Sequence, residues 1–280
     1  MGGRKAVGQG GQVFVAELGN VEADRCTQVC RSDSLTIRKY TWEDVRDALN
    51  DAMPKMAERF GNTERFEYFC KTLFKIMETH RGIKPEHFAA WLKANESAVN
   101  NYCKERKASK DFKAVAMEDL HEITYSAVVI GNLVHINPAR FLAIAEKESM
   151  LRPNKHHLNS NGSTDSGVCQ INDRNNTLAS YNKDDDYWFR KLNERMGNRG
   201  GKYMMFKFPT DIWGTNTDIL LNFWAAGIMM LEKKPRGTDA NIQKWLSAYN
   251  GKETEYGQEV YANSEKIRKA YGFCYGKVEQ

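Results

Sequence analysis

The most informative segment of the chain reads NPARFLAIAEKES from Asn137 to Ser149. Asparagine followed by proline is a strong helix start, because asparagine is a favoured N-cap and proline is favoured at the first helical position. Ile144 and Glu148 then share one face of the helix by the i, i+4 rule. The segment therefore predicts a helix with Glu148 on its apolar face, whereas Glu146 is expected on nearly the opposite side, in solvent.

A carboxyl group on an apolar helix face is costly to ionise. Desolvation disfavours the carboxylate and raises the pKa of the group. A carboxylic acid that is still protonated near neutral pH can donate a proton to a glycosidic oxygen. The alternative is a structural glutamate paired with an arginine or a backbone group, and the helix alone leaves both interpretations of Glu148 open.

A second segment reads LNSNGSTDSGVCQIN from Leu158 to Asn172. It is rich in Asn, Ser and Gly before it becomes apolar, which predicts a β-hairpin or an irregular loop. Together with Glu148 and Ser149, its part from Gly162 onward resembles the lysozyme superfamily. Animal c-type lysozymes and the small lytic transglycosylases of bacterial secretion systems and phages share the pattern Gly-Ser-Thr-Asp-x-Gly-x-x-Gln-Ile-Asn.

The spacing of two carboxyl residues agrees with this resemblance. Glu148 and Asp165 are 17 positions apart (165 − 148), as are the acid and the second carboxylate of c-type lysozymes. The resemblance implies that Glu148 and Asp165 are catalytic, and that Ser149, Gln170 and Asn172 contact the substrate.

Two later motifs resemble the transglycosylase branch of this superfamily. The segment SAYNG from Ser247 to Gly251 resembles the Ala-Tyr-Asn-x-Gly motif of that branch, and the element from Tyr256 to Val260 resembles its Tyr-Ala-x-x-Val motif. Gly257 stands where that motif has alanine. Two further departures are Lys252 after the first motif and the Val168-Cys169 pair in the earlier segment, and we expect the latter to alter packing and not chemistry.

The same resemblance adds Tyr249, Asn250 and Tyr256 to the expected substrate contacts. Tyr249 shares a helix face with Leu246, so it is expected to point inward. There it orients Glu148, borders the sugar cleft, or fills the core as an ordinary buried tyrosine.

The resemblance covers about residues 120–270 and implies a lysozyme-like α+β domain with a small β-hairpin. A polar run from 104 to 111 suggests a boundary before it. The chain is therefore expected to be mainly α, with an extended arm over 1–40, a small helical N-terminal domain over 41–115 and the lysozyme-like domain over 118–280.

Residues 41–115 show helical spacing of apolar residues and no catalytic pattern. Thr41 with Asp44 predicts a capping box at the first helix. A helix that begins near Pro85 is expected to continue through Tyr102.

The implied substrate is the glycan strand of bacterial peptidoglycan, cleaved between N-acetylmuramic acid and N-acetylglucosamine with Glu148 as general acid. In a lytic transglycosylase the same glutamate then acts as a base, and the 6-hydroxyl of the sugar closes a 1,6-anhydro ring. In a lysozyme a second carboxylate supports the intermediate and water completes the hydrolysis, a division of roles for which lysozyme is the standard example. The later motifs favour the transglycosylase, with a hydrolytic muramidase that uses Asp165 as the alternative.

Composition excludes several other classes of protein. A net charge of +5 without a run of five or more Lys or Arg argues against a nucleic-acid partner. The six cysteines are expected to be free thiols, since Cys26 and Cys30 are spaced C-x3-C with no second pair. No cofactor is expected. The apolar run from Ile219 to Leu231 contains Asn222, so it predicts a buried helix and not a membrane span.

No metal site is expected either. The segment 173–215 is longer than the resemblance predicts and contains Asp184-Asp185-Asp186, but Tyr187 stands where a calcium loop needs glycine. Adjacent residues do not share a helix face, so His156-His157 is a poor metal pair.

The chain shows no signal peptide, since its first apolar run is only Val13 to Ala16. Synthesis in the cytoplasm and action on the cell wall are then expected, as a virion component or as an endolysin released through a holin. Residues 1–115 would contact other virion or secretion-machine proteins. A structural virion protein that only binds the wall is a further alternative.

Overall fold

The computed structural model describes residues 40–78, 82–172, 218–233, 242–249 and 254–276. The predicted arm up to residue 39 and the insertion of 173–215 lie outside the described residues. The described residues, from position 40 to position 276, belong to one compact unit. This unit is mainly helical with one small antiparallel sheet, in agreement with the expected mainly-α fold class.

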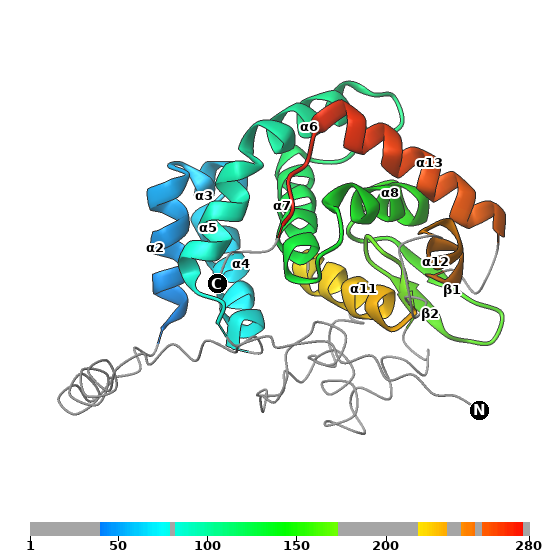
Figure 1. Cartoon of the computed structure of the whole chain (residues 1–280), viewed down its shortest axis with the longest axis horizontal. Helices are drawn as coiled ribbons and strands as arrows, with labels where there is room; N and C mark the ends of the chain where they lie inside the picture. Colours follow the sequence, from blue (N-terminus) through cyan, green and yellow to red (C-terminus); the bar gives the residue numbers. More distant parts are fainter. Residues whose placement is uncertain (1–39, 79–81, 173–217, 234–241, 250–253, 277–280) are drawn as a thin grey trace, which may run out of the picture. The chain divides into compact units, whose positions relative to one another are not determined.

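The first half of the described chain contains six helices, of which the last, α7, lies at the centre of the molecule. They are α2 (Trp42–Ala52), α3 (Met56–Arg59), α4 (Thr63–Glu78), α5 (Pro85–Ala94), α6 (Glu96–Ala108) and α7 (Met117–Leu133). Figure 1 shows α2 to α5 on one side of α7. The second half lies on its other side and contains α8 (Pro138–Ser149), α11 (Ile219–Lys233), α12 (Ile242–Tyr249) and α13 (Thr254–Tyr271).

The sheet consists of β1 (His156–Leu158), β2 (Thr164–Ser166) and β3 (Ile171–Asn172), hydrogen-bonded in that order. All its pairs are antiparallel, so the predicted hairpin is confirmed. The register places Asp165 opposite His157 on one side and opposite Asn172 on the other. The central strand thus carries the second candidate carboxylate.

The helix starts of the first half follow the local sequence signals. The capping box at α2 is present, with the Asp44 carboxylate accepting from the Thr41 backbone N–H at 2.8 Å. The helix expected from Pro85 through Tyr102 is, however, two helices, because α5 ends before Asn95 and α6 begins after it. The Asn95 side chain donates to the Cys274 carbonyl at 3.0 Å and accepts from the Cys274 N–H at 2.8 Å. The contact with Cys274 explains why the helix is interrupted at Asn95. Local periodicity cannot reveal a contact with so distant a segment.

We expected a domain boundary in the polar run 104–111. The first part of this run belongs to α6, which continues to Ala108. Ion pairs also connect the helices before this run to α7, which follows it: Arg65 on α4 donates to Asp119 at 2.6 Å and to Glu122 at 2.5 Å, both on α7. Residues 41–115 and the later helices therefore share one hydrophobic core.

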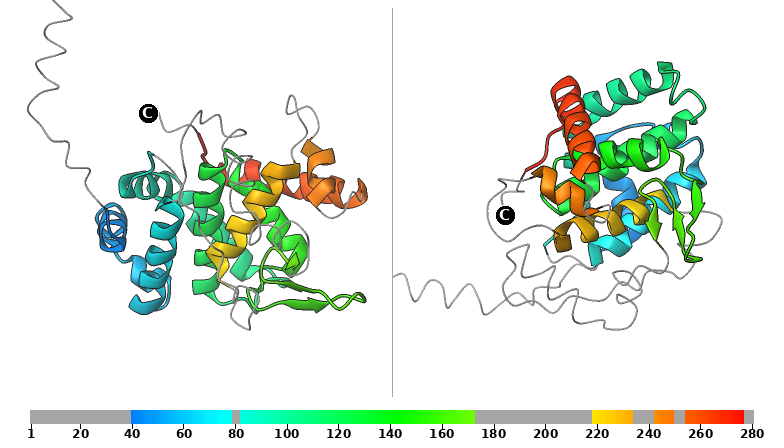
Figure 2. Two further views of the ribbon diagram at one scale, coloured as in Figure 1. Left: turned by 90° about the horizontal axis from the view of Figure 1, so that it is seen from below. Right: turned by 90° about the vertical axis from the view of Figure 1, so that its right-hand side faces the viewer.

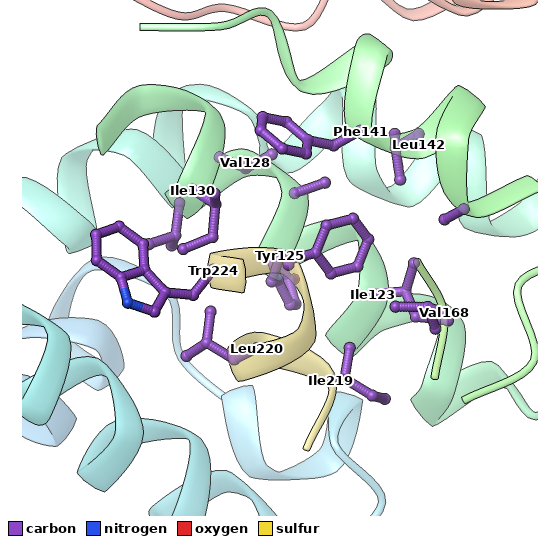
Figure 3. Packing of buried hydrophobic residues seen from close by; sticks show 14 of the residues in the cluster. Ile123, Tyr125, Val128, Ile130, Phe141, Leu142, Val168, Ile219, Leu220 and Trp224 are labelled. Atoms are coloured by element: carbon purple, nitrogen blue, oxygen red, sulfur yellow. The ribbon is translucent and has the colours of Figure 1, made fainter. Parts of the chain in front are cut away.

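The core is centred on α7 and α11. From Glu122 to Leu133 every residue of α7 is buried, as expected for a helix enclosed on all sides. Figure 3 shows Trp224 and Leu220 of α11 packed close to α7 residues such as Ile130, with Phe141 of α8 above them. The prediction of a buried helix over 219–231 is confirmed for 219–230. Among the described residues, no helix combines the length and the apolar character that crossing a membrane requires.

One buried polar side chain connects this core to the sheet. Asn222 of α11 is 0% exposed. Its amide oxygen accepts from the Cys169 N–H at 2.8 Å, and its amide nitrogen donates to the Ser166 carbonyl at 3.0 Å. Asn222 therefore pairs two buried backbone groups of the hairpin and holds β2 on α11.

We expect Asn222→Leu to lower the free energy of unfolding by about 2–4 kcal/mol, because it leaves both backbone groups buried and unpaired. Urea unfolding at equilibrium measures the change. Asn132→Leu is the matched control, since the buried Asn132 amide donates to the Val128 carbonyl within its own helix. A loss no larger for Asn222→Leu than for Asn132→Leu would contradict the assigned role.

Candidate active site

Helix α8 positions the candidate acid. Asn137 caps the helix, its side-chain oxygen accepting from the Ala139 N–H at 2.9 Å, and Pro138 occupies the first turn, as the sequence predicted. The helix ends at Met150, which adopts the left-handed conformation with φ 55°. Glu148 lies in the last turn and is partly buried.

The Glu148 carboxyl group receives a hydrogen bond from α13. The Tyr256 hydroxyl donates to Glu148 Oε1 at 2.6 Å. Burial raises the pKa of Glu148 above its ordinary value, and the Tyr256 hydrogen bond opposes the rise. The negative charge of Asp165 raises the pKa further, while Lys155 and Lys147 lower it. The net result is a glutamate whose protonated form persists to higher pH than that of an exposed glutamate.

Asp165 has a different environment in the hairpin. Asn172 donates to its Oδ1 at 2.6 Å and Asn159 donates to its Oδ2 at 3.0 Å. Each oxygen of the Asp165 carboxyl group thus accepts an amide N–H, and the two hydrogen bonds fix the orientation of the group. Asn172 therefore contacts a catalytic candidate directly, and Asn159 is a site residue that the sequence reasoning missed.

Ser149 and Gln170, both expected to contact substrate, bond to backbone groups. Ser149 is 1% exposed and its hydroxyl donates to the Ala145 carbonyl at 2.9 Å. The Gln170 amide donates to the carbonyls of Lys155 and Gly167 at 2.9 and 2.8 Å. The Ser149 bond lies within α8, whereas Gln170 ties together the loops at Lys155 and Gly167. Contact of either side chain with a substrate stays a prediction.

The two candidate tyrosines have different roles. Tyr249 points inward, as expected, but its hydroxyl donates to the Cys169 carbonyl at 2.9 Å. The hydrogen bond to Glu148 comes from Tyr256, which is 5% exposed. Burial and the neighbouring Glu148 raise the pKa of the Tyr256 hydroxyl well above its ordinary value, so it acts as a donor. Asn250, the remaining predicted contact, lies outside the described residues.

The expectation that Glu146 is solvated is wrong. Its side chain is 8% exposed, and it accepts hydrogen bonds from Tyr102, Arg106 and Asn263. Helices α6 and α13 cover the face of α8 that the local pattern left to solvent. Only tertiary packing supplies these partners.

Helices α8 and α13 are joined by a series of polar pairs, which we call the α8–α13 seam (Figures 1 and 2). Along α8 in order, its pairs are Arg140 with Ser264 and Glu265, Glu146 with Asn263, Lys147 with Glu259, and Glu148 with Tyr256. As the residue numbers rise on α8 they fall on α13, so the helices are antiparallel and Tyr256 is the last member.

Gly257 allows α13 to approach α12 next to this last pair. A Cβ atom at this position would lie 1.9 Å from Ser247 Oγ and 2.4 Å from the Gln243 carbonyl oxygen. The departure from the alanine of the resembled motif therefore has a packing reason. Alanine at 257 does not fit while α12 and α13 keep this spacing.

Within the described residues, no group of three or more His, Cys, Asp or Glu side chains could hold a metal ion. His156 Nδ1 lies 2.9 Å from Ser166 Oγ across the β1–β2 pair. The cysteines at 70, 103, 169 and 274 are free. The Asp184–Asp186 run and the Cys26–Cys30 pair lie outside the described residues.

Comparisons of the chain with protein-family models, with curated proteins and with solved structures give no match.

We expect Tyr256→Phe to raise the pKa of Glu148 by about one unit, because the carboxylate loses a donor while the aromatic ring still excludes water. NMR titration of the Glu148 side-chain carboxyl carbon measures the change. Tyr261→Phe is the matched control, since it deletes a hydroxyl from the same helix at a ring that faces Arg140. An unchanged or lowered Glu148 pKa in Tyr256→Phe would refute the assigned hydrogen bond.

We expect Gly257→Ala to lower the free energy of unfolding by about 1–3 kcal/mol, because α12 and α13 must separate to admit the methyl group. Chemical denaturation measures the loss. Gly276→Ala should leave stability nearly unchanged, since nothing lies within 4 Å of a Cβ atom there. Equal stabilities of the two variants would show that the close approach of the helices is not required.

Proposed function

We propose that this chain cleaves the β-1,4 bond between N-acetylmuramic acid and N-acetylglucosamine in bacterial peptidoglycan, with Glu148 as general acid. The observation that carries the proposal is the environment of Glu148, whose carboxyl group accepts from Tyr256 and whose pKa is raised by burial and by the negative charge of Asp165 in the hairpin. A buried carboxylic acid that works beside a second carboxyl group is typical of glycoside cleavage. The resemblance of the Glu148-Ser149 and Gly162–Asn172 segments to the lysozyme superfamily suggests the substrate class, the glycan strand of peptidoglycan.

We propose the lytic transglycosylase route as the main reaction. Protonated Glu148 gives its proton to the glycosidic oxygen, and the bond from that oxygen to C1 of the muramic acid breaks. The resulting Glu148 carboxylate then takes the proton of the 6-hydroxyl group, and the oxygen of this group bonds to C1. The product is a 1,6-anhydro sugar, no water is consumed, and Glu148 ends protonated. Tyr256 keeps the carboxyl group oriented through both proton transfers.

A hydrolytic muramidase is the second candidate, and the hairpin favours it specifically. The amides of Asn159 and Asn172 hold the Asp165 carboxylate in place. A fixed carboxylate can stabilise the positive charge that develops at C1, or bond to C1 until water replaces it. In this route Asp165 is catalytic, whereas in the first it shapes the hairpin.

The biological setting that we propose follows from the resemblance. The enzyme acts on the cell wall as a virion component or as an endolysin that a holin releases, and segments before α7 contact neighbouring virion proteins. The substrate is a glycan polymer, and the reaction needs neither a cofactor nor a metal ion.

The test is digestion of purified peptidoglycan, with products identified by mass spectrometry. We expect anhydro-muropeptides from the wild type, and a loss of at least about a hundredfold in rate for Glu148→Gln, the usual scale of a general acid. Glu64→Gln, an exposed glutamate on α4, is the matched control and should keep wild-type activity.

The products and one further variant separate the two candidate reactions. Reducing-end muropeptides from the wild type, together with loss of activity in Asp165→Asn, would establish the muramidase and reject the transglycosylase. Digestion that continues in Glu148→Gln would reject both. A folded wild type that binds peptidoglycan and releases no product would leave only a wall-binding role.

A further inference from the structure

Glu146 lies two residues before the candidate acid and connects three helices. Its Oε1 accepts from the Tyr102 hydroxyl at 2.7 Å and from Arg106 Nε at 2.5 Å, both on α6. Its Oε2 accepts from the Asn263 amide at 2.7 Å, on α13. One oxygen therefore faces α6 and the other faces α13.

Arg106 is itself held firmly on the α6 side. Its guanidinium lies 4.7 Å from the centre of the Tyr102 ring and 5.6 Å from that of Phe112. It also donates to the Tyr271 hydroxyl at 3.2 Å. A planar guanidinium fixed by rings and by a second acceptor holds the Glu146 carboxylate in one orientation.

Stability alone is a weak reason for this cluster. Burying two opposite charges costs desolvation free energy that their attraction often only offsets, and apolar residues of similar size can serve as well. Hydrogen bonds are directional, however, and apolar contacts are not. Glu146 therefore fixes the position of α13 along and around its axis more narrowly than apolar packing would.

The hydrogen bond from Tyr256 to Glu148 requires that α13 keep its position relative to α8. Asn263 follows Tyr256 by seven residues, two helical turns on the same face, and their partners on α8 are Glu146 and Glu148. A rotation or shift of α13 that broke the Asn263 contact would also move the Tyr256 hydroxyl away from Glu148.

We propose that Glu146 is a positioning residue: through Asn263 it keeps the Tyr256 hydroxyl on Glu148, and α6 holds Glu146 in place through Tyr102 and Arg106. The catalytic part of this inference rests on the proposed function of Glu148. The geometric part does not, because the Tyr256–Glu148 hydrogen bond can be measured without turnover.

The inference gives residues 41–115 a role in the site. Helix α6 lies within the segment that the sequence suggested as a separate helical domain for partner contacts. Tyr102 and Arg106 from this segment connect through Glu146 and Asn263 to the last pair of the α8–α13 seam. The helical segment is thus a structural part of the site that Glu148 forms.

The first experiment measures the pKa of Glu148 by NMR in the full chain, with Tyr256→Phe as reference. We expect Asn263→Ala to raise this pKa in the same direction as Tyr256→Phe, by up to about one unit. The double variant should match Tyr256→Phe alone, because Asn263 acts through the Tyr256 hydroxyl. A Glu148 pKa that stays at the wild-type value or falls in Asn263→Ala, or effects that add in the double variant, would overturn the proposal.

A matched pair of charge variants separates positioning from general damage. Asn263→Asp places a carboxylate against Glu146, whereas Ala262→Asp places it one residue earlier at an exposed position. We expect only Asn263→Asp to shift the Glu148 pKa as Tyr256→Phe does. Equal shifts in the two variants would overturn the inference, since they would show a charge effect independent of the seam.

The α6 side is tested with Tyr102→Phe and with Arg106→Lys, which keeps the positive charge and removes the planar guanidinium. Each should raise the pKa of Glu148 by less than Tyr256→Phe does, and an unchanged pKa in both would remove α6 from the proposal.

Kinetics then complete the test. The alkaline limb of kcat against pH should move to higher pH in Asn263→Ala, with KM little changed, because the acid stays protonated longer. If the wild type cleaves no glycan, the proposed function fails while the NMR measurements still decide the positioning role.

Discussion

The antiparallel packing of α13 on α8 is the constraint on which the site depends. Glu148 lies in the last turn of α8, and its hydrogen-bond partner comes from a helix that begins more than a hundred positions later in the sequence. The polar pairs of the seam set the register of the two helices, and the glycine at position 257 sets the distance from α13 to α12. Together they fix where the Tyr256 hydroxyl lies.

Glu146 and Glu148 show how strongly environment separates identical side chains. They lie two positions apart on one helix. Glu146 accepts hydrogen bonds from a guanidinium, a phenol and an amide. Burial raises the pKa of Glu148, and the hydrogen bond from the Tyr256 phenol offsets only part of this rise. The first glutamate joins three helices, and the second keeps its proton to higher pH than an exposed glutamate does.

Local sequence signals predicted the elements of the site but not their partners. Asn137 and Pro138 marked the start of α8, and the turn-rich run before Asn172 marked the hairpin, because caps and turns depend on neighbouring residues. The burial of Glu146, the helix break at Asn95 and the choice of Tyr256 as donor to Glu148 depend on segments far away in the chain. Periodicity carries no information on such contacts.

The bond between Asn95 and Cys274 has a consequence for the order in which the protein assembles during synthesis. These residues are 179 positions apart, and the Asn95 side chain binds both backbone groups of Cys274. A ribosome delivers Asn95 long before Cys274, so the junction of α5 and α6 is complete only after Cys274 has emerged. Contacts of such high sequence separation form late and slow folding. The α5–α6 junction is therefore completed late in translation, after the helices on either side of it have been synthesised.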